Sequence, residues 1–163
     1  EHKVDFADVA SIEVRLPPLR YQRHYSAEVK TGLRGKFAIN YVVAIAFLDG
    51  KLAIKTFTDE YVNQPQVQNA LGKVKVIVDE AIPEPGPYCP VSVELKDGTR
   101  RSHTAEIAKG DPRNPMSETE VMGKFRGNAR LAVSEKQIEA VIDSVGRLES
   151  VDNVKSIVEL LVV

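Results

Sequence analysis

Tryptophan is absent from this chain of 163 residues, and cysteine occurs once, as Cys89. A single thiol cannot form an internal disulfide bond or, alone, a thiolate metal site, so we expect a reducing, cytoplasmic setting. Long apolar runs are also lacking, since the longest, Tyr41 to Leu48, is far shorter than the roughly 20 residues that span a bilayer. We therefore predict no membrane contact.

An excess of charge of one sign is lacking too. The chain has 22 Lys and Arg residues against 23 Asp and Glu residues, a formal net charge of −1. Nucleic-acid-binding proteins normally carry a basic surface, and aromatic residues for base stacking make up only 6% of this chain. We predict no nucleic-acid partner. Its 43% hydrophobic and 28% charged residues are typical of a globular protein, and its length suits one domain with or without an appendage.

Apolar alternation and turn residues outline the first half of the chain. Residues Val9 to Leu16 alternate apolar and polar side chains and predict a half-buried strand, which Pro17-Pro18 ends. The polar stretch that follows, as far as Gly35, predicts a long loop. Residues 36–48 are the most apolar segment and predict a buried helix that ends at Gly50.

Two more alternating segments, residues 73–79 and 91–95, predict further strands. Asp97-Gly98 is a strong hairpin signal, so a return strand over about residues 99–107 pairs antiparallel with the strand before it. The C-terminal third has a different character. Capping-box patterns at Ser117 and at Ser134 each open a helical run, so strands are expected to dominate the first two-thirds and helices the last third.

Few residues stand out as candidates for chemistry. The sequence contains no phosphate-binding loop, no paired Cys or His spacing for a metal and no nucleophile elbow. Tyr41 could present its hydroxyl to a cleft as a general acid, although a core tyrosine with a satisfied hydroxyl is the commoner arrangement. Lys36 could bind an anionic substrate, against the alternative of a solvated surface lysine. His103, on a hairpin strand, and His24, in the expected loop, are interpreted as surface residues.

The segment around Tyr41 resembles a known pattern. Lys36-Phe37-Ala38-Ile39-Asn40-Tyr41-Val42-Val43-Ala44, followed by Asp49-Gly50, is similar to the K-F-S-[IL]-x-Y-x-x-A and D-G of the MmgE/PrpD family. Further similar segments occur in the same order, so that the resemblance extends from about Val9 to Ala129. They are Lys73-Val74-Lys75-Val76, Val91 to Gly98, Lys109-Gly110-Asp111-Pro112, Asn114-Pro115-Met116-Ser117 and Lys124-Phe125.

The resemblance implies a fold and an activity. Members of this family dehydrate, decarboxylate or epimerise di- and tricarboxylic acids by proton transfer beside a carboxylate, without metal or organic cofactor. They combine a large helical domain with a smaller α/β domain, and the active site lies between the two. We therefore expect an α+β chain: a two-layer α/β sandwich with a mainly antiparallel sheet over residues 1–116, then C-terminal helices over 117–163. Tyr41 becomes the expected catalytic residue and Lys36 the expected substrate-binding one.

Two departures from the family pattern bear on function. Ala38 stands where the family has a serine, which puts any hydrogen bond from that serine in doubt. The catalytic lysine and histidines of the family precede the point where this chain begins. Glu1 is not an initiator methionine, which indicates either a fragment of a longer sequence or a processed N-terminus. We therefore expect the chain alone to be an inactive part of a lyase or isomerase. The alternative is a non-catalytic binding or regulatory module.

The C-terminal helices of family members pack on the large helical domain, which this chain lacks. Ile138, Val141, Ile142, Val145 and Leu148 form an apolar stripe at helical spacing. Without that domain the stripe loses its cover, so we predict that it self-associates, giving a homo-oligomer, or packs on the α/β part.

Overall fold

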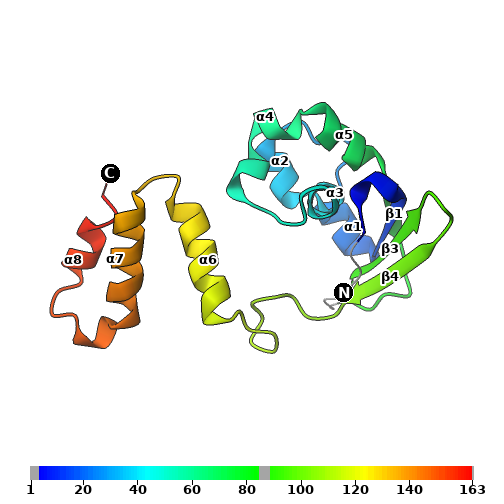
Figure 1. Cartoon of the computed structure of the whole chain (residues 1–163). Helices are drawn as coiled ribbons and strands as arrows, with labels where there is room; N and C mark the ends of the chain where they lie inside the picture. Colours follow the sequence, from blue (N-terminus) through cyan, green and yellow to red (C-terminus); the bar gives the residue numbers. More distant parts are fainter. Residues whose placement is uncertain (1–3, 85–88, 163) are drawn as a thin grey trace. The chain divides into compact units, whose positions relative to one another are not determined.

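Residues 4–84 and 89–162 are described by the computed structural model of the chain. They form two separate compact units, Glu1–Asn114 and Pro115–Val163, which Figure 1 colours from blue to green and from green to red. The division falls two residues before the boundary at residue 116 that the resemblance led us to expect.

Four strands in the first unit form one sheet in the order β2-β1-β3-β4. Strand β1 (Val9–Leu16) is parallel to β2 (Val74–Val78) and antiparallel to β3 (Cys89–Leu95). Strand β4 (Arg100–Ala105) pairs antiparallel with β3 through the turn at Asp97-Gly98, where Gly98 has a φ of 83°. The α+β class is confirmed, and the sheet is mixed, with two antiparallel pairings and one parallel pairing.

The central strand β1 explains why one face of the sheet is buried. Ile12, Val14 and Leu16 alternate with polar residues and point into the core. Val9 is also buried although it lies three residues before Ile12. The pairing of β1 with β3 shifts register between Val9 and Ser11, and one extra residue in a strand changes the phase of the alternation.

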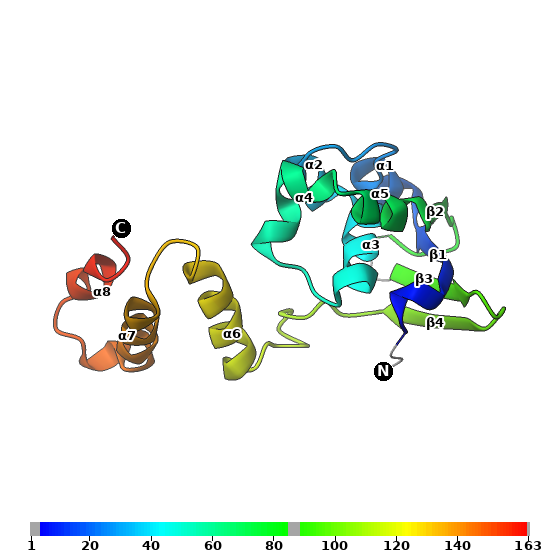
Figure 2. The ribbon, with the colours of Figure 1, turned by 45° about the horizontal axis from the view of Figure 1, so that its top comes forward.

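Helices cover that buried face, and Figure 2 shows them gathered on one side of the sheet. The longest, α3 (Ile39–Asp49), is the helix expected over residues 36–48, and it ends at Gly50, which has a φ of 70°. Its start is later than expected because Ala38 has an extended backbone, with φ −100° and ψ 108°. The remaining helices are η1 (Phe6–Asp8), α1 (Pro18–His24), α2 (Gly32–Phe37), η2 (Ile54–Phe57), α4 (Asp59–Val62) and α5 (Pro65–Gly72).

The prediction of a long loop before Gly35 was wrong, because α1 and α2 lie there. Helix α1 begins at Pro18, a position where the missing N–H of proline is no loss. Thr31 caps α2 by accepting from the N–H of Arg34 at 3.2 Å. The expectation that strands dominate the first two-thirds of the chain was wrong for the same reason, since α1 to α5 all lie before β2.

Two glycines let α2 lie close to its neighbours. A Cβ atom at Gly32 would overlap the carbonyl group of Phe57, and a Cβ atom at Gly35 would lie 2.9 Å from Cδ1 and Cε1 of Tyr41. Glycine inside a helix costs about 1 kcal/mol relative to alanine. The close approach of α2 to η2 and to the Tyr41 ring offsets that cost.

The second unit contains helices, as the C-terminal third of the sequence predicted. They are α6 (Glu118–Ala129), α7 (Glu135–Gly146), η3 (Leu148–Ser150) and α8 (Lys155–Glu159). Both capping boxes are present, one at Ser117 and one at Ser134. Arg126 of α6 donates two hydrogen bonds to Glu139 of α7, at 2.6 and 2.8 Å, so the two helices are joined by a bidentate ion pair.

The packing at Gly35 predicts the outcome of a substitution. Gly35→Ala should lower the free energy of unfolding by about 1–3 kcal/mol, the usual cost of overpacking, because neither the helix backbone nor the Tyr41 ring can move freely. Gly72→Ala, with nothing within 4 Å of the added Cβ, should change it by less than about 0.5 kcal/mol. Urea unfolding followed by circular dichroism measures both, and equal stabilities of the two variants would contradict the tight contact.

Candidate functional site

Tyr41 lies in the third position of α3 and is fully buried. Its ring is tilted by 55° against that of Phe57, with the centroids 6.0 Å apart, and its hydroxyl donates to the carbonyl oxygen of Thr56. Burial, with a smaller contribution from the negative charge of Asp49, raises the pKa of Tyr41 to about 12. The phenol therefore keeps its proton at neutral pH.

The residue that accepts that hydrogen bond also lines a small pocket. Thr56 lines a pocket of about 210 Å³ together with Asp49, Lys51, Ala53, Lys55 and Tyr61. The Tyr61 hydroxyl donates to the Asp49 carboxylate, and burial followed by this bond raises the pKa of Tyr61 to about 12. The Tyr41 hydroxyl is thus buried, yet its acceptor residue is part of the wall of an opening.

The loop after α3 shapes this pocket. Gly50 ends α3 in a left-handed conformation, which glycine adopts without strain, and the chain continues into η2. The Thr56 side chain donates to the carbonyl oxygen of Ala53 at 2.7 Å. That local bond holds the η2 turn while the carbonyl group of Thr56 accepts the Tyr41 hydroxyl.

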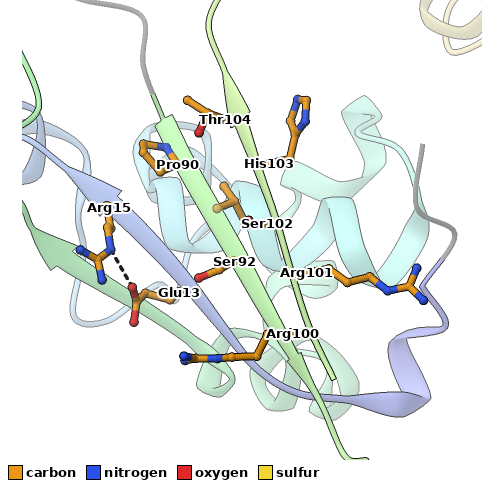
Figure 3. A pocket seen from close by; sticks show the side chains of 10 residues that line it. Glu13, Arg15, Pro90, Ser92, Arg100, Arg101, Ser102, His103 and Thr104 are labelled. Atoms are coloured by element: carbon orange, nitrogen blue, oxygen red, sulfur yellow. Dashed lines mark hydrogen bonds and ion pairs between the residues drawn. The ribbon is translucent and has the colours of Figure 1, made fainter. Parts of the chain in front are cut away.

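A second hollow, of about 410 Å³, lies on the polar face of the sheet (Figure 3). Arg15 and Arg100 lie along it, and both are paired with carboxylates. Arg15 contacts Glu13 at 2.8 Å and Asp79 at 3.4 Å, and Arg100 contacts Glu94 at 3.4 Å. The charges of Arg15 and Arg100 are thus compensated within the sheet, and Arg101, which also lines this hollow, adds a third guanidinium group.

The histidines do not converge on either site. His103 is exposed on β4, as predicted, and is one of the residues that line the polar hollow; Figure 3 shows its side chain on the other side of β4 from Ser102 and Thr104. His24 is exposed at the end of α1 rather than in a loop. Within residues 4–84 and 89–162, no three of His, Cys, Asp and Glu come together as metal ligands, and no helix has the length and apolarity to cross a bilayer.

Comparison with protein families decides the wider context. The model of the MmgE/PrpD C-terminal domain matches residues 1–148. This chain belongs to the MmgE/PrpD family. Among curated relatives, cis-aconitate decarboxylase from Mus musculus is 30% identical over 158 residues, 94% of this chain and 31% of the relative. Cis-aconitate decarboxylase from Homo sapiens is also 30% identical over 158 residues, which cover 32% of that protein. The chain thus spans about a third of their length.

The MmgE/PrpD pattern can now be placed on the fold. Ala38, which replaces the family serine, is the N-cap residue of α3 and makes no side-chain cap hydrogen bond. A serine there would accept from an N–H of the first turn, an interaction of about 1 kcal/mol. Ala38 therefore leaves the start of α3 without the side-chain cap that a serine could provide.

Lys36 is exposed in the last turn of α2, just before α3 begins. Ala38 and Asn40, on either side of the first residue of α3, are buried, and Lys36 is not among the residues that line the pocket beside Thr56. The structure therefore does not bring Lys36 and Tyr41 together at that pocket. Substrate binding by Lys36 and catalysis by Tyr41 both remain predictions.

Sequence reasoning missed the other pocket residues, Lys51, Lys55 and Tyr61. One signal was available, because residues 30–55 contain five basic side chains (Lys30, Arg34, Lys36, Lys51, Lys55) and a single acidic one, Asp49. The contact between Tyr61 and Asp49 joins residues 12 apart in the sequence, and no periodic pattern points to it.

The raised phenol pKa values predict how stability depends on pH. An unfolded tyrosine has a pKa of about 10, so the stabilisation from Tyr41 and Tyr61 is fully present below pH 10. It is lost as the pH rises through their folded pKa of about 12. Tyr41→Phe should therefore make the fall in unfolding free energy above pH 10 less steep. Urea unfolding between pH 7 and 11 measures this, and an unchanged slope would show that the Tyr41 hydroxyl is not buried.

Proposed function

We propose that this chain is the smaller, C-terminal part of a cytoplasmic lyase or isomerase that moves a proton beside a carboxylate of a di- or tricarboxylic acid. The match to the MmgE/PrpD C-terminal domain over residues 1–148 carries this proposal. It is supported by relatives that decarboxylate cis-aconitate and are about three times as long as the matched region. As the family resemblance implies, no metal or organic cofactor takes part.

Tyr41 is the proton donor in this proposal. A phenol with a pKa of about 12 is protonated at neutral pH, which suits a general acid and not a general base. To reach a substrate, its hydroxyl must exchange the carbonyl oxygen of Thr56 for a substrate atom on the pocket side. The base comes from the large helical domain, so the chain alone is inactive.

The exposed apolar side chains of α2 and η2 support the presence of a partner that contacts these two elements of the first unit. Leu33 and Phe37 lie four residues apart on α2 and are 68% and 60% exposed. Ile54 is exposed on η2, which contacts α2. Large apolar side chains gathered on neighbouring elements mark interaction surfaces. In this proposal they face the missing helical domain across the substrate cleft.

The second unit offers another apolar surface. A groove of about 330 Å³ lies between α6 and α7, lined largely by apolar side chains, and Val121 and Val145 beside it are exposed. We assign this groove to the helical domain as well. In the absence of that domain, two copies of the chain cover the grooves of each other, which gives a homo-oligomer.

The alternative function is a non-catalytic binding or regulatory module. The observation that favours it is the buried Tyr41 hydroxyl, which already has a backbone acceptor. The coding sequence that precedes Glu1 separates the two functions. A helical region that carries lysine and histidine residues supports the enzyme, and a start codon immediately before Glu1 supports the module.

Turnover assays test the enzyme directly. The 163-residue chain alone should not convert cis-aconitate, 2-methylcitrate or iminodisuccinate, whereas the chain extended by the residues that precede it in its gene should convert one of them. In the extended protein, Tyr41→Phe should lower kcat by about 10²–10⁴-fold, the usual contribution of a general acid. Tyr25→Phe is the matched control, a change in a ring stacked on Tyr21, and it should leave kcat unchanged. Turnover by the chain alone, or none by the extended protein, would refute the proposal.

Light scattering after size-exclusion chromatography tests self-association. The chain should be larger than a monomer, and Val121→Lys with Val145→Lys should shift it towards monomer, because charges in an apolar contact are costly to bury. Asn128→Lys, also at an exposed position of α6, is the matched control and should leave the mass unchanged. A monodisperse monomer of the unaltered chain would contradict the prediction.

A further inference from the structure

Charge is distributed unevenly along the first unit. Residues 30–55 carry five basic side chains and one acidic one, a net charge of +4, although the whole chain has a net charge of −1. The five basic residues are all exposed. The remainder of the chain therefore has a net charge of −5. Residues 30–55, which form α2, α3 and the start of η2, are the cationic part of the chain.

Two of those cations line the pocket beside Thr56. Lys51 and Lys55 belong to the loop and η2 turn that follow α3, and both line the pocket of about 210 Å³. The pocket contains one carboxylate, that of Asp49, which accepts the Tyr61 hydroxyl. On neighbouring α4, the Asp59 carboxylate accepts the N–H of Gly32 at 2.7 Å. The two ammonium groups thus outnumber the carboxylate in this pocket.

We propose that Lys51 and Lys55 bind the carboxylate groups of a small di- or tricarboxylic acid in this pocket. Each ammonium group is a compact charge with three donors, so the pair can hold two carboxylates of one molecule. Pockets for drug-sized ligands measure about 300–1,000 Å³. A pocket of about 210 Å³ suits a smaller acid.

The position of the pocket connects this binding to the proposed chemistry. Thr56 both lines the pocket and accepts the Tyr41 hydroxyl, so the pocket and the phenol share one residue. Identification of the bound acid as the substrate rests on the proposed function. The assignment transfers the substrate-binding role from Lys36 to Lys51 and Lys55, which are residues of the pocket itself.

Citrate is a suitable probe, because it is a stable tricarboxylate. Nitrogen-15 NMR spectra of the whole chain at low salt should show shifts of the amides of residues 51–56 and 61 on addition of citrate, and weaker ones with acetate. Lys51→Ala and Lys55→Ala should each weaken citrate binding about two- to fivefold, the scale of an exposed ion pair, and the double variant more. Lys96→Ala, at an exposed position beside the β-hairpin turn, is the matched control and should bind as the parent does.

The outcomes separate this inference from the proposed function. Citrate shifts centred elsewhere, or unchanged in the double variant, overturn the pocket assignment, and loss of binding in Lys36→Ala alone would return the role to Lys36. If the extended protein turns over an acid while the double variant keeps its KM, the lysine assignment fails and the enzyme stands. If citrate binds through the two lysines but the extended protein is inactive, the site stands and the enzyme fails.

Discussion

Helix α3 is buried on two opposite sides, and the first unit is organised around it. Ile39, Val43 and Phe47, each four residues apart, pack towards the sheet with β1. Ala38, Tyr41, Ile45 and Leu48 form the opposite stripe and pack with Val29, Val62 and Val67 of the helical layer. A helix with apolar stripes on two opposite sides must be covered on both, so α3 joins the two core clusters into one domain.

The burial of α3 on two opposite sides also limits where Tyr41 can act. Its ring is enclosed between Gly35 and Phe57, and its hydroxyl donates to the backbone oxygen of Thr56, a residue that lines the pocket. A buried phenol of this kind is an ordinary core residue with respect to stability. It acquires a chemical role only if the Thr56 carbonyl group, its acceptor, yields to a substrate. The short η2 turn, held by a local hydrogen bond of 2.7 Å, is the element on which that exchange depends.

Two surfaces of large apolar side chains fit the fact that the chain spans about a third of its curated relatives. On the first unit, Leu33 and Phe37 protrude from α2, and on the second unit a groove separates α6 from α7. The capping boxes and the ion pair between Arg126 and Glu139 stabilise the second unit from within. These local interactions explain how α6 and α7 hold their shape while the apolar groove between them stays open.

Local signals in the sequence determined much of the fold. The alternation in β1, the Asp97-Gly98 turn, the end of α3 at Gly50 and both capping boxes each depend on residues within a few positions of one another. For that reason they could be predicted. Helices α1 and α2 could not, because they are short and polar, and packing and caps rather than periodicity stabilise them.

The candidate site, like the fold, has a part that the sequence predicts and a part that only the tertiary structure shows. The sequence by itself identified Tyr41 and the family pattern around it, since both lie in one continuous segment. Only the tertiary structure decided that the Tyr41 hydroxyl meets Thr56, that Tyr61 meets Asp49 and that Lys51 and Lys55 line one pocket. Those contacts join residues up to 15 positions apart through the turn after α3, and the path of a chain through such a turn depends on the core against which it packs.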